Sequence, residues 1–138
     1  MTKAFTDIEQ SKKLAEILPI ESADMWWDET ERFPRFVKHY HEYLSQSITP
    51  IPCWSAIQLL ELIKSRENWL TNLTYILDTY NREGEYIVNM WRLTVEFTYY
   101  DKPSIREDIY ENDIIDACVE MVCWLFENGY IEKVLQLR

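Results

Sequence analysis

Two cysteines, Cys118 and Cys123, lie among carboxylates between Asn112 and Tyr130 and raise the question of a reactive or metal-binding site. Their spacing of five residues places them on different faces of a helix. A redox pair or a zinc knuckle needs closer spacing and a turn between the thiols. The spacing therefore predicts two cysteines in a helix that buries its apolar side, and it assigns them no metal, cofactor or catalytic role.

The two histidines, His39 and His41, are the other residues that could bind a metal. They would share a face of a strand, but they diverge on the helix that the surrounding pattern favours. A zinc-protease HExxH motif is absent, because position 45 is Ser. We therefore expect surface histidines and no metal site.

A third cluster mixes carboxylates with aromatic rings, a combination that occurs in glycosidase clefts. Its members are Asp24, Trp26, Trp27, Asp28, Glu29 and Glu31. Sequence spacing does not fix the distance between two carboxyl groups, so we favour an acidic loop beside a half-buried aromatic strand. Trp91, Phe97 and Tyr99 are interpreted in the same way, as core rather than as a ligand platform.

Composition excludes several classes of protein. The two glycines, Gly84 and Gly129, cannot form a phosphate-binding loop, a dinucleotide fingerprint or a nucleophile elbow. The net charge of −10 disfavours direct binding to nucleic acid and to anionic membranes, while it permits a basic protein partner.

The length of 138 residues fits one domain spanning 1–138. The first residues, MTKAFTDIEQSKK, lack the apolar region of a secretory signal, and the longest uncharged run, 43–60, carries two prolines. Three cysteines without a disulfide framework favour reduced thiols. We therefore expect a cytoplasmic protein.

Three helices are predicted from caps and apolar spacing. The first begins after Thr6 or Asp7 and ends before Pro19. The second, 55–67, has capping-box spacing at Ser55 and Gln58, with Ile57, Leu60 and Ile63 facing one way. The third, 114–128, follows an N-cap at Asn112 or Asp113 and ends at Gly129, with an apolar stripe of Ile114, Ala117 or Cys118, Met121, Val122, Leu125 and Phe126. A further helix is expected from Pro34 to 45.

The strand signals centre on a hairpin, 73–80 and 86–99, joined by a turn at Asn81–Gly84. Its second strand is long, so we expect a bend or bulge between Asn89 and Arg92. The segment 22–27 is predicted to be an edge strand, and the acidic segment 101–116 an exposed loop. The predicted fold is thus α+β: an antiparallel sheet of three to four strands with helices packed on one face. The segment 34–45 or another subunit is expected to cover the second face.

Four short blocks, "SADMWW" (22–27), "IPCWS" (51–55), "EYIV" (85–88) and "DACVEM" (116–121), occur in this order. Together they resemble blocks of a family of short uncharacterised proteins encoded by phages and integrated mobile elements of gut bacteria. The blocks comprise 21 residues, and the resemblance implies a small α+β domain in a bacterial cytoplasm. It implies no activity and no catalytic residue, and it gives no guidance between Asn89 and Asn112.

Three classes of function follow. The first and favoured class is a non-enzymatic, self-associating interaction protein, which needs only exposed apolar surface. An acidic inhibitor or nucleic-acid mimic needs the acids of 24–31 and 101–116 to converge on one face. A small hydrolase needs a concave pocket with carboxylates of shifted pKa. The sequence fixes neither that convergence nor the structure of 28–50.

Overall fold

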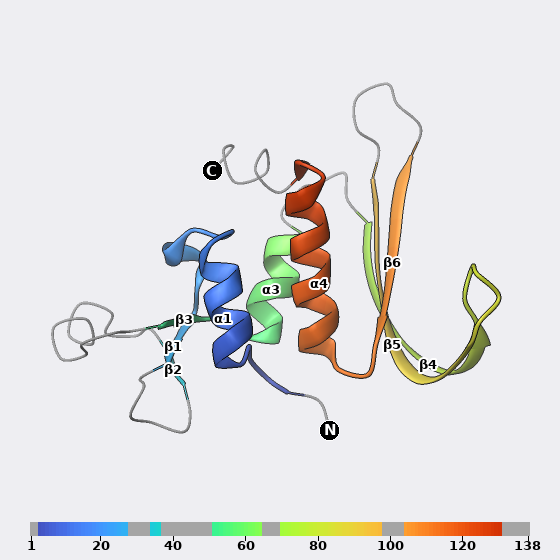
Figure 1. Ribbon diagram of the computed structural model, residues 1–138, viewed down its shortest axis with the longest axis horizontal. Helices are drawn as coiled ribbons and strands as arrows, with labels where there is room; N and C mark the ends of the chain where they lie inside the picture. Colours follow the sequence, from blue (N-terminus) through green and yellow to red (C-terminus); the bar gives the residue numbers. More distant parts are fainter. Residues whose placement is uncertain (1–2, 28–33, 37–50, 65–69, 98–103, 131–138) are drawn as a thin grey trace, which may run out of the picture.

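The computed structural model describes residues 3–27, 34–36, 51–64, 70–97 and 104–130. Its elements are α1 (Ile8–Ala15), the 3-10 turn η1 (Ile20–Ser22), β1 (Met25–Trp27), β2 (Arg35–Phe36), β3 (Ile51–Cys53), α3 (Ala56–Ile63), β4 (Leu70–Tyr80), β5 (Tyr86–Phe97), β6 (Ile105–Glu111) and α4 (Ile114–Glu127) (Figure 1).

The described strands form two antiparallel sheets, one with the order β4-β5-β6 and a smaller one with the order β2-β1-β3. Figure 1 shows the helices between the two sheets, with α4 against the large sheet and α1 beside the small one. The protein therefore has the predicted α+β fold, in which an antiparallel sheet carries helices on one face.

The helix ends follow the predicted caps. Asp7 and Gln10 form a capping box at α1, and the Ser55 hydroxyl accepts a hydrogen bond from the Gln58 N–H at α3. The α4 cap is Asp113 rather than Asn112. Each side-chain oxygen satisfies a backbone donor that the helix leaves free, so local sequence determines where the helices begin.

The core lies between α3, α4 and the central strand β5. Leu93, Val95 and Phe97 point from β5 towards α4, which buries most of its predicted stripe. Phe126 is an exception, with 42% of its surface exposed. On α3 the prediction was wrong for Ile57, which is 75% exposed; the buried residues of that helix are Leu59, Leu62 and Ile63.

Two predictions near the small sheet are wrong. The segment 22–27 supplies β1, which is the central strand of the small sheet and not an edge of the hairpin sheet. Arg35–Phe36 forms β2, so no helix begins at Pro34; the remainder of that predicted helix lies outside the described residues. Both errors concern pairing partners distant in sequence, which local periodicity does not reveal.

The predicted exposed loop at 101–116 is also wrong, because Ile105–Glu111 forms β6 and pairs with β5. Ile109 lies beside Leu93 on the face that meets α4, and it is 8% exposed. Glu107 and Asp108, between Ile105 and Ile109, obscured the period-two alternation that is typical of a strand with one buried face.

The hairpin turn is confirmed. Gly84 has φ +81°, and the Asn81 side chain accepts hydrogen bonds from the N–H groups of Glu83 and Glu85 at 3.0 and 2.9 Å. The β4–β5 pairs that the structure describes keep one register from Leu70↔Glu96 to Tyr80↔Tyr86, so of the two expected alternatives, a bend or a bulge, no bulge is found among these pairs. The hairpin nevertheless curves away from the helices (Figure 1).

Curvature brings the hairpin tip back towards the outer face of the sheet. Arg82 Nε lies 3.3 Å from an Asp108 carboxylate oxygen on β6. The same carboxylate accepts hydrogen bonds from Thr94 Oγ1 at 2.6 Å and from Arg106 Nε at 3.2 Å. Burial raises the pKa of Asp108, but these three partners lower it more, so the net pKa lies below the ordinary value.

Candidate functional site

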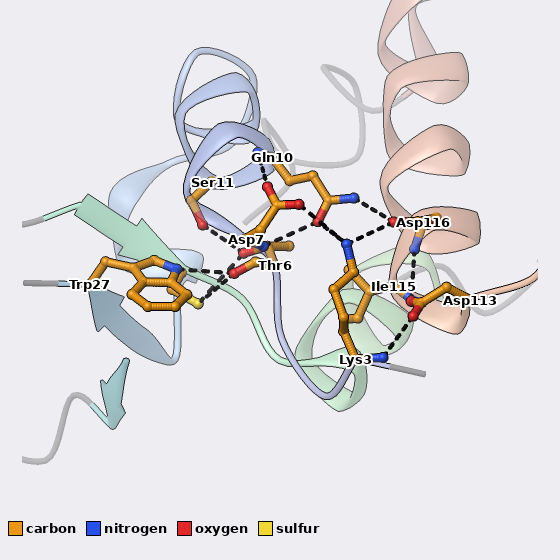
Figure 2. A network of polar contacts seen from close by, with 10 residues as sticks. Lys3, Thr6, Asp7, Gln10, Ser11, Trp27, Asp113, Ile115 and Asp116 are labelled. Atoms are coloured by element: carbon orange, nitrogen blue, oxygen red, sulfur yellow. Dashed lines mark hydrogen bonds and ion pairs between the residues drawn. The ribbon is translucent and has the colours of Figure 1, made fainter. Parts of the chain in front are cut away.

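The densest polar network surrounds residues 3–7, where the N-terminal ends of α1, α3 and α4 converge. Lys3 N–H donates to the α4 cap Asp113 at 2.7 Å, and Ala56 N–H at the start of α3 donates to the Ala4 carbonyl. Figure 2 shows the Lys3 ammonium between Asp7, Gln10 and Asp116. The N-termini of α1 and α4, which favour negative charge, thus share one small group of carboxylates, and α3 begins beside it at the Ala4 carbonyl.

The Lys3 ammonium neutralises part of this charge. It lies 3.2 Å from Asp7 and 3.0 Å from Asp116, and Gln10 Nε2 donates to Asp116 at 2.7 Å. Burial lowers the pKa of Lys3, but the hydrogen bonds and charges of Asp116 and Asp7 together raise it by more, so the net pKa lies above the ordinary value. These carboxylates cap and connect helices, which is a structural role.

Thr6 connects the same region to the small sheet. Its hydroxyl lies 2.8 Å from Ser11 Oγ and accepts from Trp54 N–H at 3.1 Å, while its carbonyl accepts from Trp27 Nε1 at 3.0 Å (Figure 2). Cys53 Sγ also contacts Thr6. All of these groups are buried, so the network satisfies polar atoms that would otherwise destabilise the core.

The predicted aromatic and acidic cluster at 24–31 does not form a cleft from its described members. Trp26 and Trp27 are buried in β1. Asp24 accepts hydrogen bonds from the backbone N–H and the hydroxyl of Ser55 at the start of α3. Asp28, Glu29 and Glu31 lie outside the described residues, as do His39, His41 and Tyr99.

Cys118 and Cys123 lie in α4, as predicted. All three thiols are free and buried. Burial raises the pKa of Cys118 to about 12 and that of Cys53 to about 11, and it also raises the pKa of Cys123. Protonated thiols are poor nucleophiles and poor metal ligands.

The aromatic residues of β5 are also in the core or at its border. Phe97 packs edge-on against Tyr130, and Trp91 packs edge-on against Tyr75 of β4 at a centroid distance of 4.9 Å. Phe97 is 2% exposed and belongs to the core, whereas Trp91 stays partly exposed beside Tyr75.

An open depression between α1, α4 and β6, here called the acidic groove, brings several titratable groups together. It has a volume of about 490 Å³ and is lined by Glu9, Gln10, Lys13, Glu111, Asp116, Val119 and Glu120. A second depression of about 340 Å³ shares Lys13, Val119 and Glu120 and continues towards Glu107 and Glu127. Lys13 is the one cation among the residues that line either depression.

Glu120 is the titratable centre of this groove. Burial, a side-chain hydrogen bond with Glu111 and the charges of Glu111 and Asp116 raise its pKa to about 7, against the opposing effect of Lys13. Two carboxyl groups that share a proton can bind a cation or exchange a proton with a ligand. The hydrolase alternative therefore rests on Glu120 and Glu111.

The groove combines residues that the sequence interpretation kept apart. Glu111 and Asp116 belong to the acidic segment 101–116, but they converge with Glu9 of α1, whereas Asp24 is bonded to Ser55. The sequence interpretation assigned Glu120 to no site. The signal that could have drawn attention to it is its spacing of four residues from Asp116, which places both on one helical face.

A different surface lies at the free edge of β4. Within the described part of the chain β4 pairs with β5 alone, and the strand runs for 11 residues. Leu70, Tyr75 and Tyr80 of this strand are 71%, 45% and 68% exposed. A shallow groove of about 320 Å³ separates β4 from α3 and is lined by Ile57, Leu60, Glu61, Lys64, Thr71 and Leu73.

Comparisons with known proteins give no relative: no family model, no curated protein and no solved structure matches the chain. Among the described residues, no group of His, Cys, Asp and Glu side chains is arranged to hold a metal ion. None of the described helices combines the length and the apolar character needed to cross a membrane.

Proposed function

We propose that this protein is a non-enzymatic interaction protein that self-associates through its β4–β5 hairpin. The observation that carries the proposal is the long free edge of β4, with its exposed apolar side chains. Tyr86 at the start of β5 adds another aromatic ring, 56% exposed and 5.3 Å from Tyr80. An edge strand of this length and composition is a template for pairing with a further strand.

Both the backbone and the side chains of β4 favour pairing with a further strand. Free N–H and C=O groups along an edge can bond to water, but pairing with a strand also buries the apolar side chains beside them. β4 carries a single charged residue, Asp78, so little charge opposes this burial. The charge of the chain as a whole lies elsewhere, notably along the acidic groove.

Sedimentation velocity over a wide range of protein concentration tests self-association. We expect a concentration-dependent dimer that persists in high salt, because apolar burial and backbone hydrogen bonds are weakly screened. The matched control replaces Glu9, Glu111 and Glu120 by Gln, and it should assemble like the wild type. A protein that stays monomeric at every concentration would contradict the proposal.

A second candidate function is binding of a basic protein partner in the acidic groove. The observation that favours it is the lining of the groove, in which the four carboxylates of Glu9, Glu111, Asp116 and Glu120 outnumber the single cation Lys13. An oligolysine peptide should bind the wild type in a salt-sensitive manner and should bind the Gln-substituted control much more weakly. Equal binding to both proteins would exclude the groove as the site.

We further propose a bacterial cytoplasmic location and an origin in a mobile element, supported by the four sequence blocks. Two of these blocks are adjacent in the fold: β1 pairs with β3, and Trp54 Nε1 donates to Ser22 Oγ at 3.0 Å. Fractionation of a bacterial host that expresses the tagged protein tests the location, and recovery in the membrane fraction would contradict it.

A further inference from the structure

We infer that the partner of the β4 edge is a second copy of this chain, paired antiparallel about a two-fold axis at Tyr75. The inference rests on the proposed function and specifies the interface. It joins two three-stranded sheets into one continuous six-stranded sheet. Three features support it: the alternation of hydrogen-bonded residues along β4, the residues that this pairing places opposite one another, and a buried hydroxyl without a partner among the described residues.

The hairpin turn determines whether odd- or even-numbered residues of β4 form backbone hydrogen bonds with β5. Asn81 N–H donates to the Glu85 carbonyl at 2.9 Å, so this opposite pair is a hydrogen-bonded pair. Such pairs alternate along an antiparallel ladder, so the odd-numbered residues of β4 bond to β5. The even-numbered residues, from Leu70 to Tyr80, direct their N–H and C=O groups to the open edge. A second strand must therefore bond to even-numbered residues.

Antiparallel pairing about Tyr75 satisfies this condition and uses all 11 residues of the strand. It places Leu70 opposite Tyr80 of the second copy and Thr74 opposite Ile76. Leu70 and Tyr80 are the two most exposed large apolar residues of β4 for which exposure is described, so the pairing covers each with the other. Asp78 stands opposite Asn72 rather than opposite its own copy, so like charges do not meet.

The face of β4 that meets the helices gives independent support. Thr71 Oγ1 is buried and has no hydrogen-bond partner among the described residues. The proposed register places Thr79 of the second copy opposite Thr71 in a non-hydrogen-bonded pair. Cross-strand threonines can hydrogen-bond to one another. Leu77 of the second copy stands opposite Leu73, at the groove between β4 and α3.

A second copy fits this edge better than a basic partner does. β4 presents one carboxylate in 11 residues, and the neighbouring groove carries Glu61 and Lys64, whose charges cancel. A cationic partner would bind instead in the acidic groove, which lies at the opposite edge of the sheet, beside β6. The β4 edge offers apolar residues and backbone groups, and its own sequence supplies the matching set.

Two substitutions test the edge. Thr74→Pro removes an outward N–H and no bond to β5, so the monomer should fold while the dimer is lost. Tyr75→Lys places two ammonium groups opposite one another at the axis, and it should weaken the dimer in a manner that salt partly reverses. Circular dichroism establishes folding, and sedimentation velocity measures assembly.

Disulfide trapping tests the register. Tyr75→Cys should form a cross-linked dimer under mild oxidation, because the two positions are directly opposite at the axis. Thr74→Cys and Ile76→Cys are matched controls that should cross-link much more slowly. Faster trapping at either control position would overturn the two-fold axis at Tyr75.

The outcomes separate the two proposals. If the wild type dimerises and the folded Thr74→Pro and Tyr75→Lys variants dimerise equally well, the β4 interface is wrong while self-association stands. If the wild type is monomeric throughout, both proposals fail. If Thr74→Pro does not fold, Tyr75→Lys and the disulfide series decide the question.

Discussion

The two edges of the large sheet are built from opposite kinds of sequence. β6 carries four charged residues among seven, whereas β4 carries one among 11. The charges of β6 are used on both faces: Asp108 holds Arg82 and Arg106 on the outer face, and Glu107 and Glu111 line the depressions beside α4. β4 has exposed apolar residues and a shallow groove instead.

This difference indicates which edge can accept a partner. Charged side chains along an edge oppose pairing with another chain, because a new strand would bury or crowd them. β6 has this protection and β4 lacks it. The two edges of the large sheet therefore differ in composition: β6 opposes pairing with a further strand, whereas β4 permits it. The following predictions test the features that hold each edge in place.

The largest effect is expected where both edges depend on one residue. Leu93 of β5 is fully buried and lies between Leu73 of β4 and Ile109 of β6. Leu93→Ala should lower the free energy of unfolding by about 2–5 kcal/mol in a denaturant melt, because it leaves a cavity. The exposed Leu70→Ala is the matched control and should change monomer stability little; a comparable loss at both positions would contradict the assigned core.

The next effect concerns the connection of β6 to α4. Asp113 accepts hydrogen bonds from Ile115 N–H, Asp116 N–H and Lys3 N–H. Asp113→Ala should lower the free energy of unfolding by about 2 kcal/mol, because three backbone donors lose their acceptor. Asp113→Asn retains one side-chain oxygen and should cost less. Equal losses for the two variants would show that the cap is not the source of the effect.

A smaller effect is expected at the turn that positions β4. Gly84 has φ +81°, and no atom lies within 4 Å of the position of an added Cβ. Gly84→Ala should therefore cost about 1 kcal/mol through backbone strain alone, measured by thermal melting. Gly84→Asn, which tolerates this conformation better, should recover part of the loss. A neutral alanine variant would contradict the assigned turn.

The smallest effect is a pH dependence beside β6. The raised pKa of Glu120, about 7, means that the folded state holds a proton more tightly than the unfolded chain, whose pKa is near 4.5. Stability should therefore fall as pH rises between these values. Glu111, Asp116, Glu9 and Lys13 surround the group. Denaturant melts should show a flatter profile for Glu120→Gln and a higher stability at neutral pH.

The prediction from sequence succeeded where the information is local. The caps at Asp7 and Ser55 and the turn at Asn81–Gly84 each satisfy nearby backbone groups, so a few residues determine them. The α4 stripe was found for the same reason. Together, these elements predicted the α+β fold.

The errors arose where pairing with another strand overrides the local pattern. Arg35–Phe36 is extended because Met25 and Trp26 pair with it, and β6 is a strand because β5 provides its partner. The acidic groove required knowing that Glu9 and Glu120 meet, and they are far apart in the sequence. Spacing within a helix identifies a shared face, but it does not identify what packs against that face.

The convergence of three helix N-termini on residues 3–7 has a consequence for the order of folding. Lys3 and its partner Asp113 are 110 residues apart, so a ribosome releases the first long before the second. The β4–β5 hairpin, by contrast, needs only neighbouring residues and can form as soon as both strands emerge. The hairpin can therefore form before α4 has emerged, and the carboxylates that pair with Lys3 become available only after that.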